Sequence, residues 1–175
     1  MKKTFKEIII IFIISLTAGL IINAFSPKGI ALVRDDSKRF VIDSTSGVSV
    51  NQRGKLDKQG FYQPVNIPVE TAKTLFDEKV VFIDGREPNE FEQGHIQGAI
   101  NIPYKDFKEK MIEEKQQVLR DLKKDQLIVS YCGSDSCEIS IDNAYEMAKA
   151  GYSDVKIYLG GFKEWNKMGY PIKNN

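Results

Sequence analysis

The sequence predicts an α/β protein, with a parallel sheet covered by helices on both faces at residues 66–175 and one N-terminal transmembrane helix before it. A continuous apolar run at 80–83 is typical of a strand buried on both faces, and the mostly apolar segments 127–131 and 155–158 predict further strands. Helical segments lie between them, and this alternation favours parallel pairing. An uncharged run at 8–25 approaches the ~20 apolar residues that a membrane-spanning helix needs.

The N-terminal region divides into a predicted anchor at residues 1–25 and a polar juxtamembrane tether at 26–65. Lys2, Lys3 and Lys6 precede the apolar run, which favours a cytoplasmic N-terminus, attachment to the membrane through this helix, and an extracytoplasmic position for the rest. The alternative is a signal peptide that is removed, although the run exceeds an ordinary h-region.

The elements of residues 66–175 follow from their apolar spacing. A short extended piece at 67–69 precedes a helix at 70–76, and Pro103 ends a short strand at 99–102. The charged segment 107–122 predicts one or two amphipathic helices. The helix at 139–149 has apolar residues on one face and Gly151 after its end, and a last helix follows Gly160-Gly161.

Composition limits the chemistry. The 175 residues carry 25 basic and 24 acidic side chains, a net charge of +1, so we expect no nucleic-acid partner. Two cysteines and one histidine exclude a disulfide scaffold and any site built from several histidines. We therefore expect neither a metal site nor a cofactor.

Cys132 is the strongest candidate for a reactive residue. It directly follows the strand at 127–131 and precedes a loop and a helix. The backbone N–H groups of such a loop and the positive end of the helix stabilise a thiolate or an anion, which lowers the pKa of the thiol below about 8.5. The alternative is a buried, inert cysteine. The predicted binding loop comprises Gly133, Ser134, Asp135, Ser136 and Glu138.

Two groups of motifs resemble the signatures of rhodanese domains. Asp84-Gly85-Arg86, the run Glu90–Ile96 and the run Gly98–Pro103 resemble the N-terminal signature. Tyr131-Cys132 and the run Leu159–Trp165 resemble the C-terminal one. The resemblance implies a rhodanese-like fold in which Cys132 holds the position of the nucleophile that carries sulfur as a persulfide.

The loop departs from that family at its cation. The family commonly has an arginine five positions after the cysteine, where this chain has Cys137. No Lys or Arg lies between Lys124 and Lys149, whereas Asp135 and Glu138 lie in or beside the loop. Because these carboxylates oppose the binding of a small dianion, we expect weak activity with thiosulfate.

Four other residues have alternative roles. Cys137 is either a resolving thiol for Cys132, a filler at the helix start or, least favoured, a metal ligand. Asp84 and Arg86 follow a strand end and either border the mouth of the site or form a turn and a structural ion pair. His95 resembles a structural element of the family more than a general base.

The sequence thus predicts a sulfurtransferase that takes sulfur from a donor onto Cys132 and passes it to a thiol acceptor, each a small molecule or a protein. Two alternatives stay open. One is a thiol–disulfide redox protein that uses Cys132 and Cys137. The other is a non-catalytic, membrane-tethered binding module.

Overall fold

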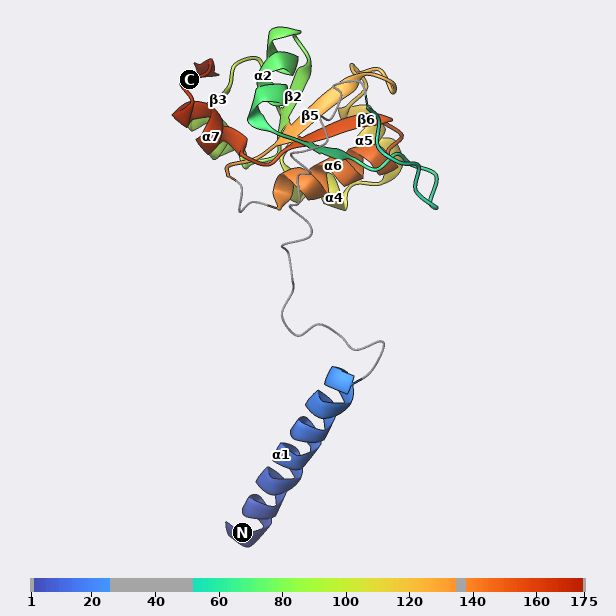
Figure 1. The fold of residues 1–175 in the computed structure, drawn as a ribbon, viewed down its shortest axis with the longest axis vertical. Coiled ribbons are helices and arrows are strands. Elements are labelled where there is room, and N and C mark those ends of the chain that lie inside the picture. The colour runs from blue at the N-terminus through green and yellow to red at the C-terminus, as the bar shows by residue number, and fades with distance from the viewer. Residues whose placement is uncertain (1, 26–51, 135–137, 175) are drawn as a thin grey trace. The chain divides into compact units, whose positions relative to one another are not determined.

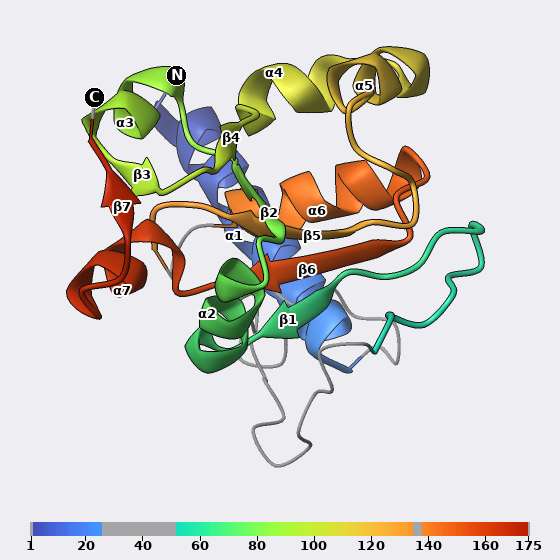
Figure 2. The same cartoon turned by 90° about the horizontal axis from the view of Figure 1, so that it is seen from above.

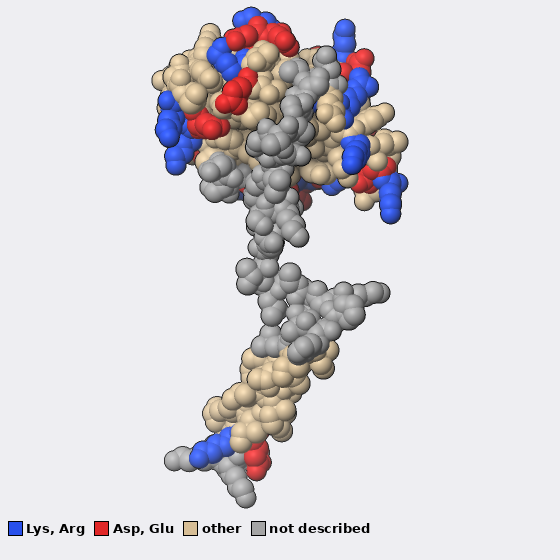
Figure 3. Space-filling view, in the orientation of Figure 1, with Lys and Arg blue, Asp and Glu red and all other residues tan. Residues whose placement is uncertain are grey.

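The structure, a computed structural model, describes residues 2–25, 52–134 and 138–174 and separates the chain into two units, Met1–Val41 and Ile42–Asn175. In the first unit, α1 (Lys2–Phe25) exposes large apolar side chains such as Ile8 and Phe12. Figure 3 shows uncharged surface along most of α1, with charged side chains at its N-terminal end. Within the described residues, no helix combines the length and the apolar character that crossing a membrane requires. The transmembrane helix predicted at residues 1–25 is therefore not supported.

The second unit is built on a five-stranded sheet in which every pair of neighbouring strands is parallel. The strand order across the sheet is β1 (Val65–Ile67), β6 (Asp154–Tyr158), β5 (Leu127–Tyr131), β2 (Val81–Asp84) and β4 (Ile100–Asn101). The predicted α/β architecture with a parallel sheet is confirmed.

Helices cover both faces of this sheet. The helices described in this unit are α2 (Val69–Asp77), α3 (Pro88–Gln93), α4 (Tyr104–Glu109), α5 (Ile112–Val118), α6 (Ile139–Lys149) and α7 (Gly161–Lys167). Figures 1 and 2 show α6 against one face, with α4 and α5 beyond it, and α2 against the opposite face. The segment 107–122, predicted to hold one or two helices, contains two, and the first of them begins earlier, at Tyr104.

Side-chain alternation along the strands divides the core into two layers. Phe82, Val129 and Tyr131 pack with Trp165 of α7 and with the buried residues of α2. The intervening residues of β5 face α6, as the hydrogen bond from Ser130 Oγ to the carbonyl oxygen of Ser140 shows. This alternation also directs the residue after β5, Cys132, toward α6.

The short strands β3 and β7 were not expected from the sequence. β3 (His95–Ile96) pairs with β7 (Ile172–Lys173) in a separate antiparallel ribbon that ties the end of the chain to the segment after α3.

The segment 52–64, part of the expected tether, contacts the sheet domain, since the buried Lys156 on β6 donates a hydrogen bond of 2.6 Å to Gln52 O. The rest of the expected tether, residues 26–51, lies outside the described residues.

Candidate active site

Cys132 lies at the carboxyl end of β5, in the middle of the sheet, and is fully buried. Helix N-termini and strand ends meet at this edge in open parallel sheets, and ligands commonly bind there. β5 runs here because its apolar residues pack against α2 and α7 on one face and α6 on the other. The sequence therefore located the candidate nucleophile through the strand that precedes it.

The start of α7 holds the backbone of this cysteine loop. The amide of Phe162 donates to the carbonyl oxygen of Cys132 at 2.8 Å, and the amide of Lys163 donates to that of Gly133 at 2.9 Å. Gly161, the first residue of α7, has a φ of +61°, and a Cβ at this position would collide with the carbonyl oxygen of Cys132. Gly161 thus makes a close backbone contact that fixes the loop.

The sulfur of Cys132 is part of a disulfide in the structure. Its Sγ lies 3.6 Å from the carbonyl oxygen of Ser134 and 3.6 Å from the hydroxyl oxygen of Ser140, in the first turn of α6. Sequence reasoning missed Ser140. The signal was available, since residues 128, 130 and 132 alternate toward the face that α6 covers.

The other predicted loop residues are distributed around this position. Gly133 and Ser134 are half-buried, and the side chain of Arg86 passes close to Gly133. Glu138 immediately precedes α6, and its carbonyl oxygen accepts hydrogen bonds from the amides of Ile141 and Asp142, both at 3.0 Å. Asp135, Ser136 and Cys137 lie outside the described residues.

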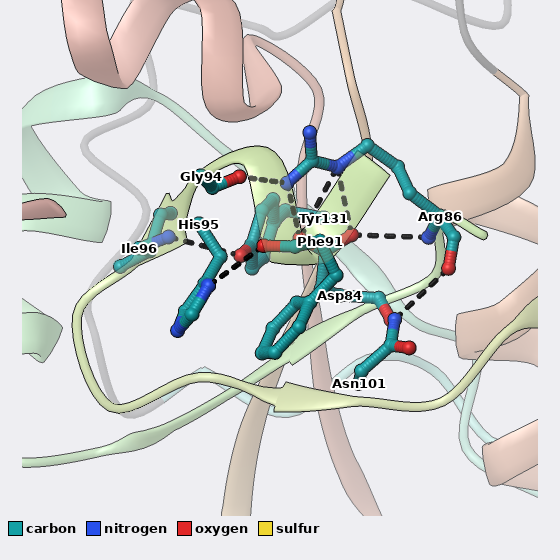
Figure 4. A network of polar contacts seen from close by, with 8 residues as sticks. All are labelled: Asp84, Arg86, Phe91, Gly94, His95, Ile96, Asn101 and Tyr131. Carbon is teal, nitrogen blue, oxygen red and sulfur yellow. Dashed lines mark hydrogen bonds and ion pairs between the residues drawn. The ribbon is translucent and has the colours of Figure 1, made fainter. Parts of the chain in front are cut away.

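Asp84 and Arg86, which follow β2, form a buried ion pair. Arg86 Nε lies 3.0 Å and Nη2 lies 2.6 Å from the Asp84 carboxylate, and Nη2 also donates to the carbonyl oxygen of Gly94 at 2.7 Å (Figure 4). Burial lowers the pKa of Arg86, but the hydrogen bond and the charge of Asp84 outweigh it and raise the pKa. Nε and Nη2 of the guanidinium are therefore occupied by contacts within the fold.

Tyr131 joins this corner from β5. Its hydroxyl accepts a hydrogen bond from the amide of Ile96 at 3.1 Å and is hydrogen-bonded to Asp84. Burial, followed by the charge and hydrogen bond of Asp84, raises the pKa of Tyr131 far above its usual value. Since Tyr131 stays protonated, the corner formed by Asp84, Arg86 and Tyr131 is held together by one ion pair and its hydrogen bonds.

His95 lies beside this corner and away from solvent. Its Nδ1 is 2.9 Å from the carbonyl oxygen of Phe91, and its ring stacks on the Phe91 ring with centroids 3.7 Å apart (Figure 4). These contacts hold the end of α3 against β3. Among the residues that the structure describes, no three His, Cys, Asp or Glu side chains come together in a way that would hold a metal ion.

Comparison with known proteins gives one family. The family model for the rhodanese-like domain matches residues 68–168. The chain is 32% identical over 115 residues to thiosulfate sulfurtransferase 16, chloroplastic, of Arabidopsis thaliana, covering 63% of this chain and 93% of that protein. It is 25% identical over 130 residues to rhodanese-like domain-containing protein 15, chloroplastic, of the same plant, covering 71% and 70%.

Solved structures agree with the fold. The BH2092 protein of Bacillus halodurans superimposes with a TM-score of 0.54 at 21% identity, covering 63% of this chain and 77% of that one. At this identity the likeness is one of architecture, and it matches the parallel sheet and the helices on its two faces.

Proposed function

We propose, because the chain belongs to the rhodanese-like domain family, that it is a sulfurtransferase that carries sulfane sulfur as a persulfide on Cys132. This membership confirms the resemblance read from the motifs around Asp84 and Cys132. Relatives that include a thiosulfate sulfurtransferase support a sulfurtransferase-type function. The observation that carries the proposal for this chain is the placement of Cys132, at the carboxyl end of a central strand and under the start of α7.

The proposed transfer has two steps. The Cys132 thiolate attacks the outer sulfur of a donor such as thiosulfate, so that a bond from Sγ to this sulfur forms, the donor S–S bond breaks, and sulfite leaves with the electron pair. An acceptor thiolate then attacks the outer persulfide sulfur, which yields a persulfide on the acceptor and returns the Cys132 thiolate.

Cys137 is proposed as a resolving thiol. Its thiolate attacks Sγ of the Cys132 persulfide, a disulfide forms between the two cysteines, and hydrosulfide leaves. A thiol reductant then opens the disulfide. Two facts support this proposal: Cys132 is disulfide-bonded in the structure, and the chain contains two cysteines. Since a disulfide sulfur is not a nucleophile, we expect sulfur transfer to require a reducing pretreatment.

Weak turnover of thiosulfate is part of the proposal. Arg86, whose side chain passes close to Gly133 of the loop, pairs with Asp84 and Gly94 O. Glu138 borders the loop, and a carboxylate there opposes a doubly charged donor. We therefore expect thiosulfate to be a poorer donor than a persulfide of lower net charge, such as cysteine persulfide.

The test compares two matched cysteine variants. After reduction, Cys132→Ser is expected to lose sulfur transfer to the rate without protein. Cys137→Ser is expected to keep transfer to an added thiol but to lose the release of hydrosulfide in the absence of that thiol. Sulfur transfer that survives in Cys132→Ser would refute the proposal.

A second candidate function is thiol–disulfide exchange between Cys132 and Cys137, which the disulfide at Cys132 favours. It predicts a rapidly reducible bond and little persulfide. Mass spectrometry of the reduced protein after exposure to a persulfide donor separates the two functions. A species one sulfur atom heavier, absent from Cys132→Ser, supports sulfur transfer, whereas reoxidation without added sulfur supports disulfide exchange.

A further inference from the structure

Ser140 presents a hydroxyl to the reactive sulfur. It is fully buried in the first turn of α6, and its Oγ lies 3.6 Å from Sγ of Cys132. This separation is within the range for a hydrogen bond to sulfur, an atom larger than oxygen. None of the sequence motifs assigned a role to this residue.

The direction of this hydrogen bond follows from the state of the sulfur. Cys132 is disulfide-bonded in the structure and therefore carries no proton to donate. The Ser140 hydroxyl is the partner that has one. The carbonyl oxygen of Ser140 is already engaged, since it accepts a hydrogen bond of 2.9 Å from Ser130 Oγ on β5. The backbone of Ser140 is thus held to the strand while its hydroxyl points at the sulfur.

The carbonyl oxygen of Ser134 lies on the same sulfur and has the opposite effect. A carbonyl oxygen accepts a hydrogen bond from a thiol and repels a thiolate, so this contact favours the protonated form. A hydroxyl donor favours the anion. The two groups, both 3.6 Å from Sγ, therefore oppose each other in setting the acidity of Cys132.

We propose that Ser140 is a further catalytic residue, whose hydroxyl donates a hydrogen bond to the Cys132 thiolate and stabilises the attacking form of the sulfur. The role in catalysis rests on the proposed sulfur transfer, but the effect on the thiolate does not. Stabilising the thiolate raises the fraction of nucleophile at neutral pH.

Other titratable groups lie on or next to the strands and helices of this part of the fold. They are Asp84 and Arg86 after β2, Tyr131 on β5, Tyr158 on β6, Glu138 and Asp142 at α6, and Lys163 and Glu164 on α7. Asp135 belongs to the part of the loop outside the described residues. Removing the Ser140 hydroxyl changes none of these groups, so the difference between variants isolates the hydroxyl.

The test measures the pH dependence of alkylation of Cys132 by iodoacetamide. Cys137→Ser is the parent, so that one thiol reacts. Adding Ser140→Ala is expected to raise the pKa of Cys132 by about one unit and to slow alkylation about tenfold at a pH below both pKa values. Ser140→Gly, which also lacks the hydroxyl, must show the same shift.

Ser130→Ala is the matched control. It removes an equally buried hydroxyl that bonds to the backbone of Ser140 rather than to the sulfur. Its profile is expected to stay within about twofold of the parent. An unchanged profile in Ser140→Ala, or an equal shift in Ser130→Ala, would overturn the role of Ser140. If the parent transfers no sulfur while Ser140→Ala still shifts the profile, the proposed function fails and the thiolate contact stands.

Discussion

β2 and β5 are neighbouring strands that end side by side, with Asp84 opposite Tyr131. The residues that follow the two strands nevertheless make different kinds of contact. After β2, Arg86 and Asp84 satisfy each other, and Gly94 O takes a further guanidinium N–H. After β5, backbone amides of α7 bind the carbonyls of Cys132 and Gly133 and leave the sulfur to the loop and α6. A charged residue at the functional edge of a sheet is therefore not by itself a ligand for substrate.

Arg86→Met tests the buried ion pair between Arg86 and Asp84 and should have the largest effect on stability. It leaves the fully buried carboxylate of Asp84 without its counter-charge, which should cost about 3–5 kcal/mol in the free energy of unfolding. Denaturant unfolding at neutral pH measures the loss. Adding Asp84→Asn should recover part of it, because the uncompensated charge is then gone.

Lys73→Met provides the control for an ion pair near the surface. Lys73 pairs with Asp77 one turn along α2, and both side chains are partly exposed. Its removal should cost less than about 1 kcal/mol. An equal loss in the free energy of unfolding in Arg86→Met and Lys73→Met would show that Arg86 and Asp84 do not form the buried ion pair described above.

Gly161→Ala tests the contact between the start of α7 and the cysteine loop after β5. Its φ of +61° disfavours a side chain, and the added methyl group meets the carbonyl oxygen of Cys132. We expect a loss of about 1–3 kcal/mol in stability and a larger proportional loss in sulfur transfer, because the displaced backbone carries Cys132, the proposed nucleophile. Gly169→Ala, also at positive φ (+69°) but with no atom near the added methyl, should lose stability without a specific loss of transfer.

The sequence predicted the cysteine loop after β5 better than the ion pair after β2, and the reasons are physical. A mostly apolar strand followed by Cys132 is a local pattern, and Gly160-Gly161 marked the turn next to it. The role of Arg86 depends on a carbonyl at Gly94, eight residues away, and on the stacking of Phe162, which no local spacing shows. The ribbon of β3 and β7 was missed because two-residue strands carry no periodicity.

Glu146 allows the pH dependence of an ion cluster to be tested far from the ion pair after β2 and the cysteine loop after β5, near the C-terminal end of α6. Burial alone would raise its pKa, but hydrogen bonds from Lys115 and Lys149 outweigh this and lower the pKa below its ordinary value of 4.5. Because the folded-state pKa is depressed, the stabilisation is present above about pH 4.5 and disappears as the pH falls through the folded-state pKa.

Glu146→Gln should therefore cost about 1 kcal/mol at pH 7, and the difference from the unaltered protein should shrink below pH 4.5. Thermal unfolding across this range measures it. Sulfur transfer at neutral pH should not change. A difference that grows toward acid would show that the lysines do not favour the ionised carboxylate.

Phe162 connects the ion pair after β2 and the cysteine loop after β5 and should show the smallest effect. Its amide donates to the carbonyl oxygen of Cys132, and the centroid of its ring lies 4.6 Å from the Arg86 guanidinium carbon. A double-mutant cycle of Phe162→Leu and Arg86→Met, read by denaturant unfolding, should give a coupling of about 0.5–1 kcal/mol, as expected for a cation over an aromatic ring. The backbone contact to Cys132 survives Phe162→Leu, so the cycle isolates the ring. A coupling of zero would show that the Phe162 ring does not stabilise the Arg86 guanidinium, and that α7 contacts the ion pair after β2 without strengthening it.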